Sequence, residues 1–103
     1  MRKRGRRDGN HKLVIRELRA IGYSVHDLGG VGDGCPDIVV GAQGKNWLFE
    51  IKDPAQPPSK RRLTSDERIF FANWRGQVRK VETAEEIIEV VRNSYGRSSE
   101  STN

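Results

Sequence analysis

The 103-residue sequence has little of what several common classes of site require: one cysteine, Cys35, one methionine and two histidines. With a single cysteine no intramolecular disulfide can form, so we expect a reducing, cytoplasmic compartment. Two histidines and one cysteine do not make a zinc site of familiar spacing. No apolar run is long enough to span a membrane, and no signal-peptide pattern is present. The length and composition are those of a single small globular domain.

Positive charge is concentrated at the N-terminus. The chain has a net charge of +5, and residues 1–9 account for +4 of it, with five basic residues and one acid. A near-neutral body with a basic arm is typical of a protein that contacts phosphates, although a solubilising or vector-derived tail has the same composition. A second basic cluster lies in the body, at Lys60, Arg61 and Arg62. The five basic residues of the arm are Arg2, Lys3, Arg4, Arg6 and Arg7.

Residues 36–52 are typical of a β-hairpin, because two short runs rich in β-branched and aromatic residues flank Gln43-Gly44. If those two residues form the loop, Ala42 pairs with Lys45, and Asp37 then lies opposite Glu50. Side chains alternate along a strand, so Lys52 shares the face of Glu50. The opposite face is apolar and is the expected core; it carries Ile38, Val40, Trp47, Phe49 and Ile51.

Asp37, Glu50 and Lys52 form a candidate metal site on that polar face. Two carboxylates held face to face repel each other, and a hard divalent cation converts the repulsion into binding. Lys52 beside them could hold a phosphate oxygen or orient an attacking water. The alternative is an exposed hairpin face whose charges only solvate the domain.

A helix is expected over residues 10–21, capped by Asn10 and stopped by Gly22. At 100° per residue, Glu17 falls inside an apolar stripe about 140° wide. A carboxylate in that position should be paired, protonated or linked to a metal, unless it lies at the edge of the stripe and reaches water or an arginine. The other members of the stripe are Leu13, Val14, Leu18 and Ile21.

The rest of the chain predicts a strand at 23–28, a glycine-rich loop at 29–36, a helix at 64–74, a strand at 77–82 and a last helix opened by Thr83. Thr64 and Glu67 make a capping-box pattern that also places Glu67 on the apolar side of its helix. From residue 93 onward the composition is typical of a disordered tail. The predicted order of elements is therefore α-β-β-β-α-β-α, an α/β domain over 10–92 between an arm (1–9) and a tail (93–103).

This order, with its motifs, resembles the PD-(D/E)XK nuclease superfamily. Within it the chain is similar to the stand-alone, phage-like form of the virus-type replication-repair nuclease domain (VRR-NUC), which is also found in Fanconi-associated nuclease. The resemblance covers roughly residues 10–92. It rests on four stretches, 34–38, 49–52, 63–67 and 76–81, which read GCPDI, FEIK, LTSDE and GQVRKV.

The resemblance implies a restriction-endonuclease-like core with a mixed four-stranded sheet flanked by helices. It implies that Asp37, Glu50 and the Ile51 backbone carbonyl bind Mg²⁺ or Mn²⁺, that Lys52 is catalytic, and that Glu17 approaches the site from the first helix. The family commonly has glutamine where this chain has Glu67, which leaves the role of Glu67 open.

The activity expected from the resemblance is metal-dependent hydrolysis of DNA by a structure-selective endonuclease. Small stand-alone members resemble junction resolvases, so branched DNA and a homodimer are the expected partners, with Phe70, Phe71 and Trp74 as candidate interface residues. The basic arm and Lys60–Arg62 would hold the DNA backbone. Two alternatives stay open: a flap- or restriction-like nicking nuclease, and a DNA-binding module without catalysis.

Overall fold

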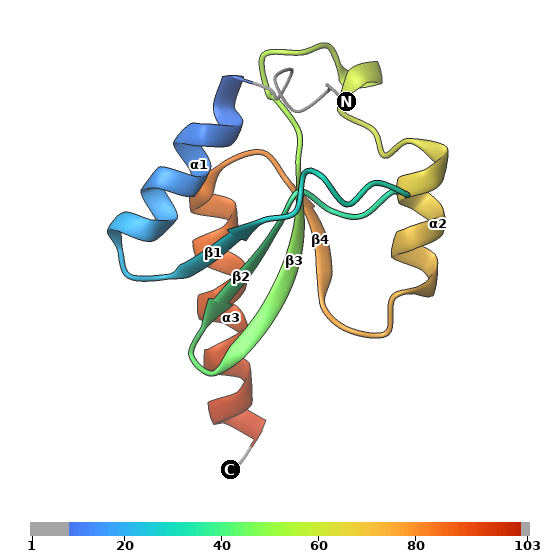
Figure 1. Cartoon of the computed structure of the whole chain (residues 1–103). Coiled ribbons are helices and arrows are strands. Elements are labelled where there is room, and N and C mark those ends of the chain that lie inside the picture. The colour runs from blue at the N-terminus through green and yellow to red at the C-terminus, as the bar shows by residue number, and fades with distance from the viewer. Residues whose placement is uncertain (1–8, 102–103) are drawn as a thin grey trace.

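The structure is a computed structural model that describes residues 9–101; residues 1–8, which carry all five basic residues of the arm, and residues 102–103 lie outside the described part. Its elements follow the predicted order, with one short 3-10 helix added between the third strand and the second helix (Figure 1). They are α1 (Gly9–Ala20), β1 (Ser24–Asp27), β2 (Ile38–Ala42), β3 (Lys45–Ile51), η2 (Pro58–Lys60), α2 (Ser65–Asn73), β4 (Val78–Val81) and α3 (Ala84–Ser101).

The four strands form one mixed sheet in the order β1-β2-β3-β4. β1, β2 and β3 follow one another in the chain and pair antiparallel, whereas β4 follows α2 and pairs parallel to β3. A parallel neighbour needs such a crossover, because the chain must return to the same end of the sheet. The prediction of an α/β domain with a mixed four-stranded sheet is therefore confirmed.

The β2–β3 hairpin has the predicted register, with Ala42 opposite Lys45 and Ile38 opposite Phe49. Both loop residues have positive φ, 57° at Gln43 and 77° at Gly44. Two positive φ values in a two-residue loop define the type I′ turn, whose twist matches that of the strands. The turn chemistry thus sets which side chains face one another along the hairpin.

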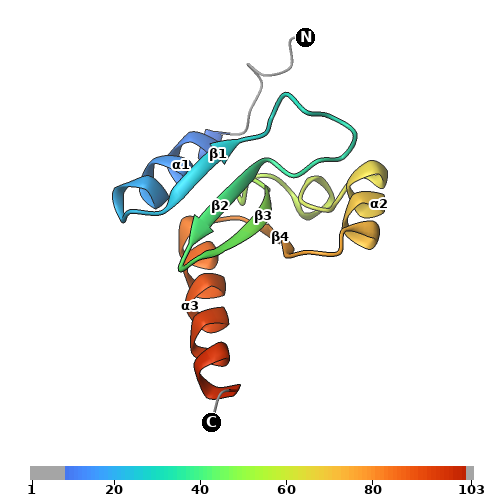
Figure 2. The ribbon, with the colours of Figure 1, turned by 60° about the horizontal axis from the view of Figure 1, so that its bottom comes forward.

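One face of the sheet carries the hydrophobic core, which α1 and α3 cover (Figures 1 and 2). All five hairpin residues expected in the core are buried there. α2 lies apart from this core, beside the loop that joins β1 to β2 (Figure 2). The buried hydrophobic residues are Val14, Leu18, Ile38, Val40, Trp47, Phe49, Ile51, Val81, Ala84, Ile87 and Val91.

The expectation that Glu17 faces inward is wrong, because this side chain is exposed. The helix turns only one edge of its apolar stripe toward the sheet, the edge with Val14 and Leu18, and buries His11 beside them. Leu13 and Ile21, which flank Glu17 on the helical wheel, are exposed as well. At the other end of the chain, α3 runs to Ser101 and so continues past residue 93, where the sequence predicts a disordered tail.

Candidate functional site

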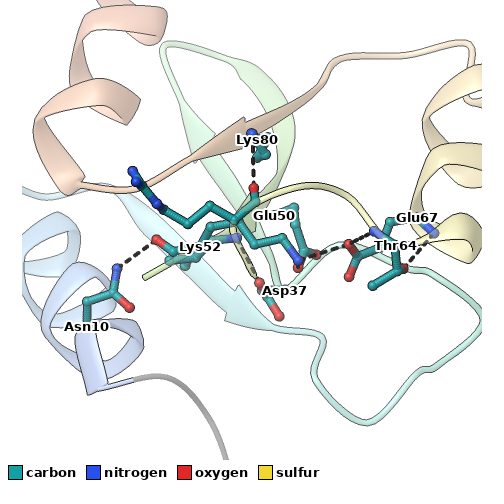
Figure 3. A network of polar contacts seen from close by, with 9 residues as sticks. Asn10, Asp37, Glu50, Lys52, Thr64, Glu67 and Lys80 are labelled. Atoms are coloured by element: carbon teal, nitrogen blue, oxygen red, sulfur yellow. Dashed lines mark hydrogen bonds and ion pairs between the residues drawn. The ribbon is translucent and has the colours of Figure 1, made fainter. Parts of the chain in front are cut away.

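Asp37 lies one residue before β2 and is held against the end of β3. Its backbone N donates to Phe49 O (3.0 Å), and its carboxylate Oδ2 accepts a 2.7 Å hydrogen bond from Ile51 N. Because Ile38 pairs with Phe49, the next step of the antiparallel ladder places Asp37 opposite Glu50. Figure 3 shows the two carboxylates on the same side of the hairpin. The arrangement is the one that the hairpin register predicts.

Glu50 is a buried acid, with 5% of its surface exposed. Burial, then the charges of Asp37 and Glu67, raise its pKa from 4.5 to about 9. In the absence of a cation the side chain therefore keeps its proton at neutral pH. A cation bound next to this carboxyl group would lower its pKa and favour its ionised form.

Lys52 bridges two carboxyl groups. Its Nζ lies 3.3 Å from Glu50 Oε2 and 3.0 Å from Glu67 Oε1, and the side chain is largely buried (Figure 3). Burial by itself would lower the pKa of Lys52, but the hydrogen bond to Glu67 and the charge of Glu50 outweigh burial and raise the pKa. The ammonium group is therefore charged and held between Glu50 and Glu67.

Glu67 serves two partners with one oxygen. Its Oε1 accepts from Thr64 N (2.9 Å) as well as from Lys52, while Glu67 N donates to Thr64 Oγ1 (3.2 Å). The reciprocal pair is the predicted capping box at the start of α2. Burial opposes ionisation, but the Thr64 and Lys52 hydrogen bonds together lower the Glu67 pKa. Glu67 thus carries the negative charge that holds Lys52, and it links α2 to the site.

The orientation of the Ile51 carbonyl follows from two backbone hydrogen bonds. Lys52 N donates to Val81 O (2.8 Å), on the β4 side of β3, whereas Ile51 N donates to Asp37 on the β2 side. Within a strand, the N–H and C=O of one residue point to the same neighbouring strand. The Ile51 carbonyl therefore points toward the β2 side, where Asp37 lies.

Asn10 makes contacts that the sequence does not reveal. Its Nδ2 donates to Lys52 O (3.2 Å) and Glu82 O (2.9 Å), across the ends of β3 and β4 (Figure 3). Because α1 already begins at Gly9, Asn10 does not take the predicted position of a cap. Its side-chain amide instead joins the ends of the parallel strands β3 and β4 by donating to a backbone carbonyl just beyond each. Because Lys52 is held at both its N–H and its C=O, the bridge helps fix the direction of the lysine side chain.

The remaining predicted site residues are dispersed. Glu17 is exposed on α1, and the charges that shift the Glu50 pKa belong to Asp37, Glu67 and Lys52. Arg61 pairs with Glu82 (3.4 Å) and its carbonyl accepts from Lys80, so it points toward the body of the domain. Lys60 and Arg62 are exposed, and the five basic residues of the arm lie outside the described residues.

The loop between β1 and β2 borders the site. Gly34 has φ +76°, and a Cβ there would overlap the Asp66 backbone carbonyl in the first turn of α2. The close backbone approach that the glycines permit is thus made to α2. Burial, then the charges of Glu50 and Asp37, raise the pKa of the neighbouring Cys35 thiol, so it is not an activated nucleophile.

Within residues 9–101, no group of three or more His, Cys, Asp and Glu side chains is arranged to hold a metal ion. The carboxylate pair would need backbone and water oxygens to complete a coordination shell. Among the helices of the described range, none is long and apolar enough to cross a membrane. Comparison with models of known protein families, with curated proteins and with solved structures finds no match to this chain.

Proposed function

We propose that the chain is a metal-dependent DNA endonuclease with a PD-(D/E)XK-type site formed by Asp37, Glu50 and Lys52. The observation that carries the proposal is the carboxyl pair at the hairpin end, in which Glu50 is 5% exposed, with Lys52 Nζ 3.3 Å from Glu50 Oε2. A hairpin that needed only solubility would expose these groups. Burial of the Glu50 carboxyl group beside a second carboxylate has a cost in folding free energy that a functional site explains.

The donor set fits Mg²⁺ or Mn²⁺. Asp37 and Glu50 supply hard carboxylate oxygens, and the Ile51 carbonyl points to the same side of β3. Mg²⁺ characteristically takes one or two carboxylates and keeps several waters, so a two-carboxylate site suits it. When bound, the ion would supply Lewis-acid activation of water and neutralise charge on the phosphate.

The chain's own residues would then act as follows. Glu50 would lose its proton to solvent when a cation is bound beside it, and Asp37 is kept in place by the Ile51 N–H. Lys52 is positioned to bind a phosphate oxygen or to orient the attacking water, because its charged Nζ is already held beside Glu50 and Glu67. Stabilisation of developing charge by such a fixed cation is a large term in phosphoryl chemistry.

The charge distribution favours a nucleic acid as the substrate. Residues 58–81, which include η2, α2 and β4, carry seven basic and two acidic side chains, whereas residues 82–101, which include α3, carry five acidic and two basic ones. The positive segment adjoins the site through Glu67, and the acidic helix lies on the far face of the sheet (Figure 1). Phosphate contacts of this kind supply affinity without sequence preference.

Within the proposed function, branched DNA and a homodimer are the preferred substrate and assembly. A C₂ dimer matches the two-fold symmetry of a four-way junction, which needs two coordinated nicks. The alternatives are a flap- or restriction-like nicking nuclease that acts as a monomer, and a DNA-binding module without catalysis.

Cleavage of plasmid, linear duplex, flap and four-way-junction DNA, with and without Mg²⁺, tests the proposal. We expect Asp37→Asn and Glu50→Gln to abolish cleavage and to leave DNA binding in EDTA largely intact. Lys52→Ala should reduce turnover and retain metal binding. Asp33→Asn, an exposed acid on the adjacent loop, is the matched control. Cleavage by Asp37→Asn at the wild-type rate would refute the assigned site.

Removal of residues 1–8 tests the role of the arm and leaves α1 complete. We expect weaker binding to all DNA shapes alike, with a flatter salt dependence, since five phosphate-binding side chains are removed. A loss confined to one DNA shape would show instead that the arm recognises structure.

A further inference from the structure

The C-terminal end of α2 presents an aromatic side chain to solvent. Trp74, the residue that follows α2, is 47% exposed, and Ile69 on the helix is 60% exposed. The structure describes every residue of α2, and none of them is buried. The helix therefore offers apolar surface that the described part of the domain does not cover, in the segment that also carries the excess of positive charge.

The Trp74 ring is held in a fixed position. It stacks on Phe70 with the ring centroids 5.1 Å apart and the planes 15° from parallel. Its Nε1 edge lies against Gly76, where an added Cβ would come within 2.8 Å of Nε1. Phe70 supports one face of the indole, and the glycine lets its edge approach the backbone. A ring fixed in this way loses little conformational entropy when a ligand stacks on it.

At the Trp74 surface, which the sequence suggested as a dimer interface, the charges favour a polyanion over a second copy of the chain, so the proposed homodimer would have to form through another surface. Arg68 precedes the aromatic residues, Arg75 follows Trp74, and both are exposed. In a two-fold symmetric dimer the same patch meets itself, so these arginines would approach their own copies. A nucleic acid strand instead supplies phosphates for the arginines and flat bases for the indole.

We propose that Trp74, supported by Phe70 and flanked by Arg75, is a stacking site for an unpaired base of a DNA strand. The inference rests on the proposed function and defines its substrate class: DNA in which bases are unstacked, as at a flap or a branch point. A fully paired duplex offers no free base face, so the site discriminates by DNA structure. Stacking on one aromatic residue typically changes affinity by about tenfold.

Binding measured in EDTA tests the site without any requirement for cleavage. The probe is an oligo-dT strand, with a blunt duplex of equal length as the comparison. The chain has two tryptophans, and Trp47 is 2% exposed in the core, so a change in fluorescence on oligo-dT binding should come from Trp74. We expect quenching in the wild type and its loss in Trp74→Leu.

Trp74→Leu keeps an apolar side chain and should weaken oligo-dT binding about five- to tenfold, while duplex binding changes less than twofold. Gly76→Ala keeps the tryptophan but displaces its edge, and should weaken oligo-dT binding in the same direction. Ile21→Ala, which removes an apolar side chain that is 52% exposed in the turn after α1, is the matched control and should have no effect.

Unchanged oligo-dT affinity in Trp74→Leu would overturn the inference. A wild-type dimer that Trp74→Leu converts to a monomer, with oligo-dT affinity unaltered, would assign the surface to a second copy of the chain. Absence of cleavage by the wild type would contradict the proposed nuclease but leave the stacking result standing, so the two failures are distinguishable.

Discussion

Lys52 Nζ lies 3.0 Å from Glu67 Oε1, and the same oxygen accepts the Thr64 N–H that caps α2. Glu67 therefore holds the site lysine and the helix start together. We expect Glu67→Gln to lower the pKa of Lys52, because the neutral amide keeps an acceptor but removes the charge that favours the ammonium form. An NMR titration that follows the Lys52 Cε resonance measures the shift directly.

Glu67→Ala removes both bonds, and its loss of the cap should cost about 1 kcal/mol in the free energy of unfolding. Asp66→Ala, an exposed first-turn acid, is the control. A Lys52 pKa unchanged in both Glu67 variants would show that Glu50 alone determines it.

Glu50 should make the domain less stable as the pH rises. Its folded-state pKa is about 9 against an ordinary value of 4.5, so the folded chain binds the proton more tightly than the unfolded chain. The associated stability is fully present below pH 4.5 and is lost as the pH rises through 9. Glu50→Gln, which mimics the protonated acid, should remove this dependence.

Urea denaturation in EDTA at pH 5 and pH 9 checks this expectation. At pH 5 the wild type and Glu50→Gln should have similar free energies of unfolding. At pH 9 the free energy of unfolding of the variant should be larger by roughly 1–3 kcal/mol, because water that enters the folded protein reduces the full cost of the buried charge. Glu85→Gln, an exposed acid on α3, is the control. Equal stability of wild type and Glu50→Gln at pH 9 would contradict the assigned ionisation.

The effect of Asn10→Asp on the free energy of unfolding distinguishes a bridging role of Asn10 from a capping role. Asp is as good as Asn near a helix N-terminus, where it is favoured by the dipole. In the bridge, however, a carboxylate would face two carbonyl oxygens, Lys52 O and Glu82 O. We therefore expect Asn10→Asp to lower the free energy of unfolding more than Asn10→Ala does, the latter by about 1–3 kcal/mol. Chemical denaturation of the pair measures this order, and the reverse order would restore the capping role.

Gly34 and Gly44 form a matched pair for the contact between the β1–β2 loop and α2. Both have positive φ, 76° and 77°, but only Gly34 has backbone within reach of an added Cβ. Alanine at either position is disfavoured by the positive φ. At position 34 the added Cβ must also displace the Asp66 backbone carbonyl. We expect Gly34→Ala to destabilise the domain by about 1–3 kcal/mol more than Gly44→Ala. Equal values from thermal melting would show that the loop moves freely away from α2.

The features of the hairpin that the sequence predicted correctly depend on residues that are close together in the chain. The Gln43-Gly44 turn sets the register from Ala42–Lys45 onward, and counting along the ladder brings Asp37 beside Glu50. The alternating pattern of β3 placed its apolar side in the core.

Other features depend on contacts distant in sequence. The helical wheel of α1 defined a stripe but not which edge of it meets the sheet, so Glu17 was placed inward although it is exposed. The Asn10 bridge joins residues 42 and 72 positions apart, and no local pattern signals it. The capping box was visible in the sequence, but the additional bond from Glu67 to Lys52 required the fold.

The isolation of α2 from the hydrophobic core has a consequence for how such a domain can diverge. Since all its residues, within the described range, keep some exposure to solvent, most positions on the helix are open to substitution with little folding penalty. Its attachment to the domain runs through Glu67 and the Gly34–Asp66 contact. The helix is therefore the segment whose surface related chains could change most freely while the sheet and its carboxylates stay the same.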